Sequence, residues 1–298
     1  MLDGVMLLWF ILTGLSVLFV AIDVWRTPEA TALRWGFIIL TVFAGPLAAF
    51  FYVLGCREPF PGAHERYVAA TWKQVLGSTM HCASGDGLGI IIGAAVGSLM
   101  TLPFALDAGL EYLLGFGFGW LFFQAFAMRD MAGGDYVKSL RMTFIPEFLS
   151  MNVLMAGMIL VSRFWMPHVE GASHPSHPAF WFIMSMALIA GFICAYPMNW
   201  WLVTRKLKHG MMTIRRQTTD QSRAHDMSSM DHDMPSGKHD RSSMDHDMSG
   251  MDHGGHGHAM GEHAAKASRA SIMVAGMVSI AILAAAITVV LRFGPTTS

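Results

Sequence analysis

The stretch TMHCASGDGLGIIIGAAVG, residues 79–97, decides the fold class of this chain. Apart from one histidine and one aspartate it holds small or apolar residues, and the apolar run around it covers residues 76–100. A helix of about 20 such residues crosses the roughly 30 Å hydrocarbon core of a bilayer. The stretch therefore predicts a transmembrane helix.

Runs of similar length recur along the chain. They cover residues 5–22, 35–54, 109–128, 145–164, 180–202 and 272–291. With 53% hydrophobic and only 14% charged residues, the 298-residue chain has too little polar surface for a soluble globule. A transmembrane barrel would instead need alternating strands of about ten residues. The sequence predicts an all-α fold, a polytopic bundle of about seven transmembrane helices in a lipid bilayer.

Basic residues indicate the orientation of the bundle. Lysine and arginine concentrate in the second, fourth and sixth loops, and cytoplasmic loops carry such an excess. The residues counted are Arg57, Arg66, Lys73, Arg129, Lys138, Arg141, Arg205, Lys206, Lys208, Arg215 and Arg216. The N-terminus and the sixth loop are therefore predicted to be cytoplasmic. The net charge of −1 and the lack of a basic patch give no reason to expect a nucleic-acid partner.

The sixth loop carries an internal repeat that predicts metal binding. SSMDHDM occurs at residues 228–234 and again at 242–248, and histidine recurs every seven residues from 225 to 253. Imidazole suits copper, zinc and nickel, and thioether sulfur selects Cu(I). The predicted ligands are His225, Met227, Met230, His232, Met234, His239, Met244, His246, Met248, Met251, His253, His256, His258, Met260 and His263. Copper, as Cu(I), is the favoured ion, and zinc or nickel are alternatives.

The repeat also has a simpler interpretation, as an acidic, solvated linker whose histidines bind nothing. Pro235, Gly237, Gly254 and Gly255 interrupt any helix in it, and Ser and Asp are weak helix formers. We expect disorder without metal and local ordering with it.

Ionisable and sulfur side chains inside the predicted spans are candidate site residues. Asp86 lies deep in an apolar run, where an ionisable side chain is costly and usually lines a path or pairs. Cys82 is four residues earlier and shares its helix face, whereas His81 lies about 100° around. For His81, a satisfied buried histidine and a metal ligand are alternative interpretations.

Two later spans offer further candidates. Glu147 is followed by Met151 and Met155 near one face, and Cys194 and Met198 are four residues apart. Counted at about 1.5 Å per residue from the nearest basic residue, imidazole, carboxylate and sulfur fall at similar depths on three helices. These residues predict an intramembrane metal site, although methionines in a membrane helix also serve as apolar filling.

Glycines form a stripe on the third span. Gly85, Gly89, Gly93 and Gly97 recur at every fourth residue and would let another helix approach the backbone closely. The stripe predicts a packing seam, and it is also a candidate face for a homo-oligomer. The three cysteines are widely spaced, so no disulfide framework or zinc knuckle is expected.

Residues 70–212 resemble an uncharacterised bacterial membrane family, domain of unknown function 4396. The resemblance rests on residues 79–97, on GFGFGWLFFQAFAMR at 115–129 and on YPMNWWLVTRKLKHG at 196–210. The His81–Cys82 pair matches the family, while Asp86 and the region of Leu88 and Gly89 replace a second cysteine and a glutamate. Pro197, Asn199, Trp201, Leu202 and His209 match at the other end. The resemblance implies a bacterial inner-membrane protein and lends no mechanism.

This resemblance divides the chain into four parts. They are two N-terminal transmembrane helices (1–69), a four-helix core (70–212), the Met/His-rich insert (213–270) and a C-terminal transmembrane helix (271–298). The leading hypothesis is copper transport or an accessory role in copper homeostasis. The alternatives are a passive metal buffer or sensor on a membrane scaffold and, less favoured, a membrane-embedded enzyme. No Walker loop or dinucleotide fingerprint is present.

Overall fold

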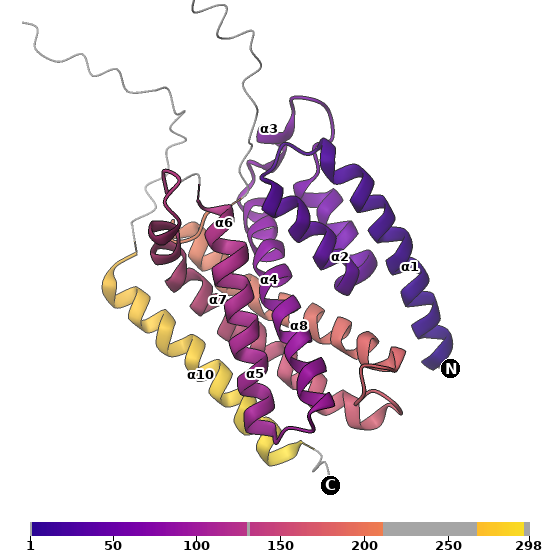
Figure 1. The fold of residues 1–298 in the computed structure, drawn as a ribbon. Helices are drawn as coiled ribbons and strands as arrows, with labels where there is room; N and C mark the ends of the chain where they lie inside the picture. Colours follow the sequence, from indigo (N-terminus) through magenta and orange to yellow (C-terminus); the bar gives the residue numbers. More distant parts are fainter. Residues whose placement is uncertain (1, 130–131, 211–266, 295–298) are drawn as a thin grey trace, which may run out of the picture. The chain divides into compact units, whose positions relative to one another are not determined.

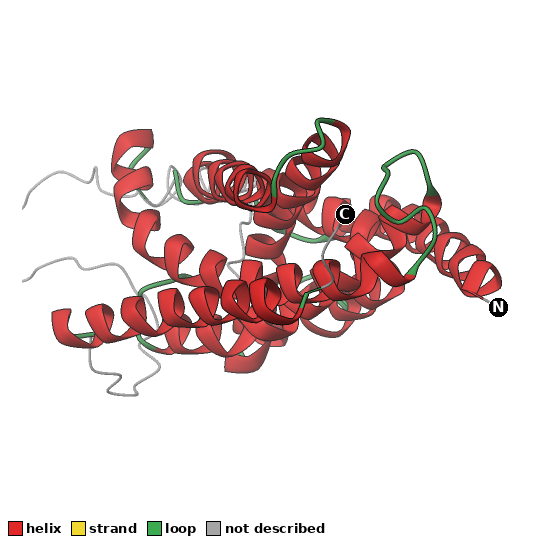
Figure 2. Ribbon diagram, turned by 90° about the horizontal axis from the view of Figure 1, so that it is seen from below, coloured by secondary structure: helices red, strands yellow, loops and turns green. Residues whose placement is uncertain are grey.

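The computed structural model describes residues 2–129, 132–210 and 267–294, and every regular element among them is helical (Figure 2). The helices are α1 (Leu2–Asp23), α2 (Thr31–Phe51), α3 (His64–Val68), α4 (Thr71–Leu99), α5 (Phe104–Gly117), α6 (Ala125–Ala127), α7 (Tyr136–Trp165), α8 (Pro178–Thr204) and α10 (Arg269–Phe293). A π-helical stretch, Phe118–Gln124, joins α5 to α6.

Seven helical segments within the described residues are long and apolar enough to cross a membrane, which confirms the all-α, multi-pass fold. Some helices extend beyond the apolar runs that predicted them. α7 begins at Tyr136 instead of residue 145, because the Asp135 side chain accepts the backbone N–H groups of Val137 and Lys138 and caps the helix. Polar first turns of this kind are not visible to a count of apolar residues.

Three helices of the predicted core, α4, α7 and α8, are the most buried spans, and the terminal helices α1 and α10 are the least buried; α2, which lies outside that core in the sequence, is more buried than α5. In the most apolar window of each span, 67% of α4 and 72% of α7 is buried, against 11% of α1 and 17% of α10. α1 packs along α2, and α10 packs along α7 (Figure 1). The exposed leucines, isoleucines and valines of the outer helices suit lipid chains, which are as apolar as leucine.

The glycine stripe of α4 is a packing seam within the chain. A Cβ built on Gly85 would lie 2.9 Å from the Gly119 Cα, and one on Gly93 would lie 2.7 Å from the Glu111 Cα. Gly89 packs in the same way against the backbone of Leu114 and Gly115. The predicted seam is confirmed, and its partner is the α5 region of the same chain. This face is therefore covered, and a homo-oligomer would need another surface.

A glycine also shapes the contact between the two N-terminal helices. Gly45 has φ +55°, a left-handed conformation that other residues rarely adopt, and Pro46 follows it inside α2. A Cβ at Gly45 would meet the Thr13 hydroxyl at 2.5 Å and the Trp9 ring at 3.1 Å. Glycine thus allows both the break in α2 and the close approach of α1.

At the end of the bundle away from Lys208, two acidic side chains of α5 meet an arginine of α7. Arg163 bonds Asp107 and also contacts Glu111 at 3.4 Å. These residues line a cavity of about 1030 Å³ that also meets α4, α8 and α10. The sequence does not predict this contact, because the acidic pair and the arginine lie on separate helices that are far apart in the chain.

The loop between α1 and α2 buries an acidic side chain whose ionisation opposes folding. Glu29 is 3% exposed, and His64 lies 3.4 Å from its carboxyl group. Burial raises the pKa of Glu29 from 4.5 to about 8, although Arg34 and the Ala30 backbone oppose the shift. The folded pKa lies above the unfolded one, so between these two values raising the pH ionises the unfolded state first and favours unfolding.

We therefore expect the purified protein to lose stability as the pH rises from about 5 to 8, by at most about 1.4 kcal/mol per pH unit. Glu29→Gln cannot ionise and should flatten this dependence. Thermal unfolding in detergent over that pH range measures the effect, with exposed Glu65→Gln as the control. Equal slopes for the parent and Glu29→Gln would contradict the assignment.

Candidate metal centre

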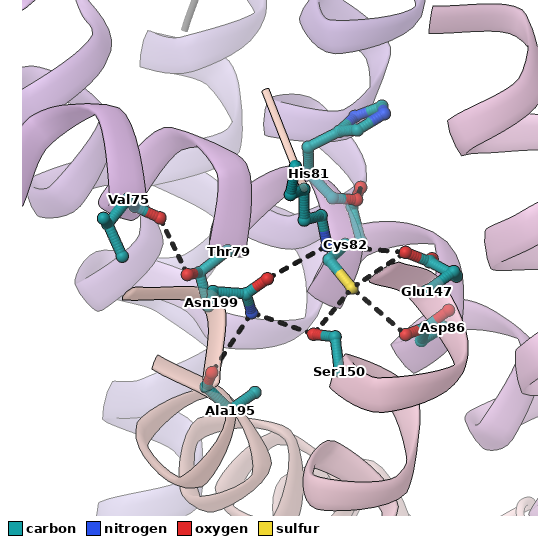
Figure 3. Close-up of polar contacts among 11 residues, drawn as sticks. Val75, Thr79, His81, Cys82, Asp86, Glu147, Ser150, Ala195 and Asn199 are labelled. Atoms are coloured by element: carbon teal, nitrogen blue, oxygen red, sulfur yellow. Dashed lines mark hydrogen bonds and ion pairs between the residues drawn. The ribbon is translucent and has the colours of Figure 1, made fainter. Parts of the chain in front are cut away.

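A buried thiol and two buried carboxyl groups meet between α4 and α7. Cys82, Asp86 and Glu147 each offer a ligand atom, and these atoms all lie within 4.8 Å of one another (Figure 3). The Cys82 Sγ lies 3.3 Å from Asp86 Oδ2 and 3.4 Å from Glu147 Oε2. All three side chains are almost completely buried. We call this group the thiol–carboxyl cluster.

Local sequence explains how the helices bring the cluster together. Cys82 and Asp86 are one turn apart on α4, so both point to the same side of that helix. Gly119 has no side chain, and a Cβ there would clash with Asp86 and lie 2.8 Å from Glu147 Oε1. Pro146 removes one backbone donor from α7 immediately before Glu147. Irregular backbone at membrane depth is tolerated where it is buried in protein, and the π-helical stretch lies here.

Three further polar side chains complete the cluster. Cys82 donates to Ser150 Oγ at 3.2 Å, and Asn199 Nδ2 donates to the same hydroxyl at 2.8 Å. Lys208 Nζ donates to Asn199 Oδ1 at 3.0 Å and lies 3.4 Å from Glu147 Oε2. Figure 3 shows the chain of contacts from Asn199 through Ser150 to the sulfur. The sequence did not predict that Ser150, Asn199 and Lys208 contact the cluster.

Lys208 supplies the positive charge of the cluster. Its side chain is 6% exposed, although it follows the end of α8. Burial opposes the charged ammonium, but the facing Cys82, Glu147 and Asp86 raise the pKa of Lys208 above its ordinary value. One ammonium group thus faces two carboxyl groups and a thiol. Asp86 Oδ1 and Glu147 Oε1 are buried and have no hydrogen-bond partner among the described residues. One ammonium group can neutralise only one of the two carboxylates, so the cluster can also hold a proton or one more cation.

The structure gives the other intramembrane candidates different surroundings. The His81 ring points away from the Cys82 sulfur, as Figure 3 shows. Met151 and Met155 are buried in the hydrophobic core. On α8, Asn199 reaches the cluster, while Cys194 is exposed and Met198 is half-buried. The predicted ligands of the insert, from His225 to His263, lie outside the described residues.

The donor set of the cluster is suited to a transition-metal cation. Thiolate selects Cu(I) and Zn(II), and carboxylates bind Zn(II) as well. Ligand atoms within 4.8 Å of one another need only small side-chain movements to reach a common ion.

The core of the chain matches a known protein family. Residues 71–208 match the family model described as Domain of unknown function (DUF4396). These residues form a DUF4396 domain. The match confirms the family resemblance, and it extends from the start of α4 to Lys208, so it includes every residue of the cluster and its polar partners. No curated protein and no solved structure matches the chain.

Proposed function

We propose that this protein handles copper in the bacterial inner membrane, as a transporter or a transport accessory. The observation that carries the proposal is the buried thiol–carboxyl cluster, where Cys82, Asp86 and Glu147 offer ligand atoms within 4.8 Å of one another. An ionisable group at membrane depth usually marks an ion or proton path. The Met/His-rich insert supports copper as the cargo, because it alternates imidazole and thioether donors.

In this proposal the insert gathers Cu(I) on the cytoplasmic side and the cluster binds it within the bundle. Binding of Cu(I) to the Cys82 sulfur releases the thiol proton, so the ion replaces a proton and net charge is conserved. The charge balances when that proton leaves the cluster, and a neighbouring carboxyl group can carry it on its way out. Zinc or nickel are alternative cargoes, since the cluster also offers carboxylates.

Lys208 has a defined role in this scheme, as a tethered cation that holds the place of the cargo. Its ammonium group contacts Glu147 and Asn199. An arriving cation would compete with Lys208 for Glu147, and its departure would let the salt bridge form again. The competition gives the site two alternative occupants with similar charge.

A matched pair of cysteine variants tests the role of the cluster. Cys82→Ser removes the soft donor, and we expect copper transport by the protein in proteoliposomes to fall at least about tenfold, because oxygen ligands bind Cu(I) poorly. Cys194→Ser makes the same chemical change at an exposed position of α8 and should transport like the parent. Equal transport by Cys82→Ser and the parent would overturn the proposal.

A passive metal buffer or sensor on a membrane scaffold is the second candidate. The Lys208–Glu147 salt bridge favours it, because an ammonium group already occupies the cation position of the cluster. Deletion of residues 222–264 separates the candidates when it is combined with Cys82→Ser. A buffer loses bound copper and copper tolerance only with the deletion, whereas a transporter loses activity with either change.

A further inference from the structure

A second group of soft donors surrounds a small pocket beside the cluster. The pocket has a volume of about 210 Å³, and we call it the access pocket. His81 of α4, Met128 after α6, Met142 of α7 and His209 after α8 line it, together with Lys208. Four separate segments of the chain therefore contribute a histidine or a methionine to the lining of one pocket.

His81 brings a buried imidazole with unsatisfied hydrogen-bonding capacity to the access pocket. It is 5% exposed, and neither ring nitrogen makes a hydrogen bond of good geometry within the described residues, although the Phe123 backbone lies nearby. Gly36 of α2 and the Phe123 ring pack beside the imidazole. Buried polar groups are normally hydrogen-bonded, so an unpartnered buried imidazole calls for a ligand. The ring faces away from the cluster (Figure 3), so that ligand is not the Cys82 site.

The soft donors of the pocket follow a gradient of burial. Met142 is 47% exposed, and His209 is also exposed. Met128 is half-buried, and His81 is buried. Cu(I) can exchange between sulfur and imidazole donors that are presented in turn from the surface inward. The gradient matches a route into the bundle.

Charge in the pocket favours a monovalent soft ion over a divalent one. Lys206 and Lys208 both line the pocket, and the carboxyl group that lines it, Glu29, contacts His64 at 3.4 Å. The remaining metal-binding side chains are neutral imidazoles and thioethers. Zn(II) prefers thiolate, imidazole and carboxylate ligands. Neutral sulfur and imidazole donors suit Cu(I).

Two residues connect the access pocket to its surroundings. Lys208 lines the pocket and also bonds Glu147 and Asn199, so it lies between the pocket and the thiol–carboxyl cluster. Gly210 lines the pocket as well, and the sequence that follows it leads into the Met/His-rich insert. The pocket is therefore next to the thiol–carboxyl cluster, and one of its lining residues shortly precedes the insert in the sequence.

We propose that the access pocket is a distinct Cu(I)-binding site, in which His81, His209, Met128 and Met142 hold the ion before it displaces Lys208 from the cluster. The inference rests on the proposed function, and it assigns His81 to this site and not to the Cys82 site. Two or three of the donors bind the ion at a time, because they lie at different depths.

Methionine methyl resonances test the pocket in the full-length protein. With ε-¹³C-methionine labelling, Met128→Leu and Met142→Leu assign the two signals, and Cu(I) is then added under reducing conditions. We expect at least one of the two signals to shift with Cu(I) and neither with Zn(II). His209→Ala, at an exposed position that tolerates change, should reduce the shift, and His81→Ala should abolish it. Met277 on the exposed face of α10 is the control that does not move.

The outcomes separate this inference from the proposed function. In Cys82→Ser the Met128 or Met142 shift should persist, because the pocket does not use the thiol. If both signals stay in place while transport still depends on Cys82, the access pocket is not a metal site. If they shift in the parent but Cys82→Ser transports normally, the pocket binds copper and the proposed role of the cluster fails.

Discussion

Gly89→Leu is expected to prevent the accumulation of folded protein. A Cβ at this position would lie 2.6 Å from the Gly115 Cα and would also clash with the Leu114 carbonyl oxygen. Both obstacles are backbone atoms, so no side chain can turn aside. Helices in lipid have no hydrophobic driving force toward one another and depend on close packing. Overpacking usually costs about 1–3 kcal/mol, and we expect more than about 3 kcal/mol where backbone must move.

The measurement is the yield of monodisperse protein in detergent, together with its thermal unfolding. Gly117→Leu is the matched control, because it places the same side chain on α5 at a position with no neighbouring atom within 4 Å. It should retain or slightly raise stability, since leucine favours helix more than glycine by about 0.8 kcal/mol. If the two variants behave alike, the α4–α5 seam does not hold the bundle together.

The sequence predicts the seam well because its pattern is local. Gly85, Gly89, Gly93 and Gly97 recur at the spacing of one helix face, and α4 needs no tertiary information to align them. The partner of the seam could not be predicted. α5 and a second copy of the chain would pack on such a stripe in the same way.

The candidate site was predictable only in part, for the same reason. Cys82 and Asp86 lie on one helix, so their common face follows from sequence, and Glu147 stands out as a carboxylate within an apolar span. The rotation of α8 about its own axis cannot be predicted from the sequence, because α8 carries apolar side chains on all its faces. Asn199 therefore faces the cluster, where Cys194 and Met198 were the predicted donors.

Lys208 shows a different limit of sequence reasoning. In a loop that follows a transmembrane helix, a lysine is normally a topology signal, and it was counted as one. The chain instead folds back after α8, where Lys206 has φ +57° and the Leu207 and Lys208 N–H groups both bond to the Leu202 carbonyl. This turn directs the ammonium group toward Glu147. Counting the charges of a loop cannot predict that the chain folds back and buries one of them.

Lys208→Met is expected to destabilise the protein by about 3–5 kcal/mol, because it leaves the Glu147 carboxyl group buried without its cation. Asn199 Oδ1 also loses its donor. The double variant Lys208→Met/Glu147→Gln removes both charges and should recover most of the loss. Thermal unfolding in detergent at neutral pH measures both effects. Lys206→Met, at an exposed position two residues earlier, should change stability by less than about 0.5 kcal/mol.

The pH dependence of this effect has a defined sign. The folded pKa of Lys208 lies above its ordinary value, so its charge stabilises the fold fully at neutral pH, and this contribution is lost only as the pH rises through the folded pKa. The gap between parent and Lys208→Met should therefore be constant near neutrality. If the losses of Lys208→Met and Glu147→Gln simply add in the double variant, the two groups are not coupled. Coupling of the two side chains is the condition for an incoming metal ion to compete with Lys208, because a cation can displace the ammonium group only from a carboxylate that binds it.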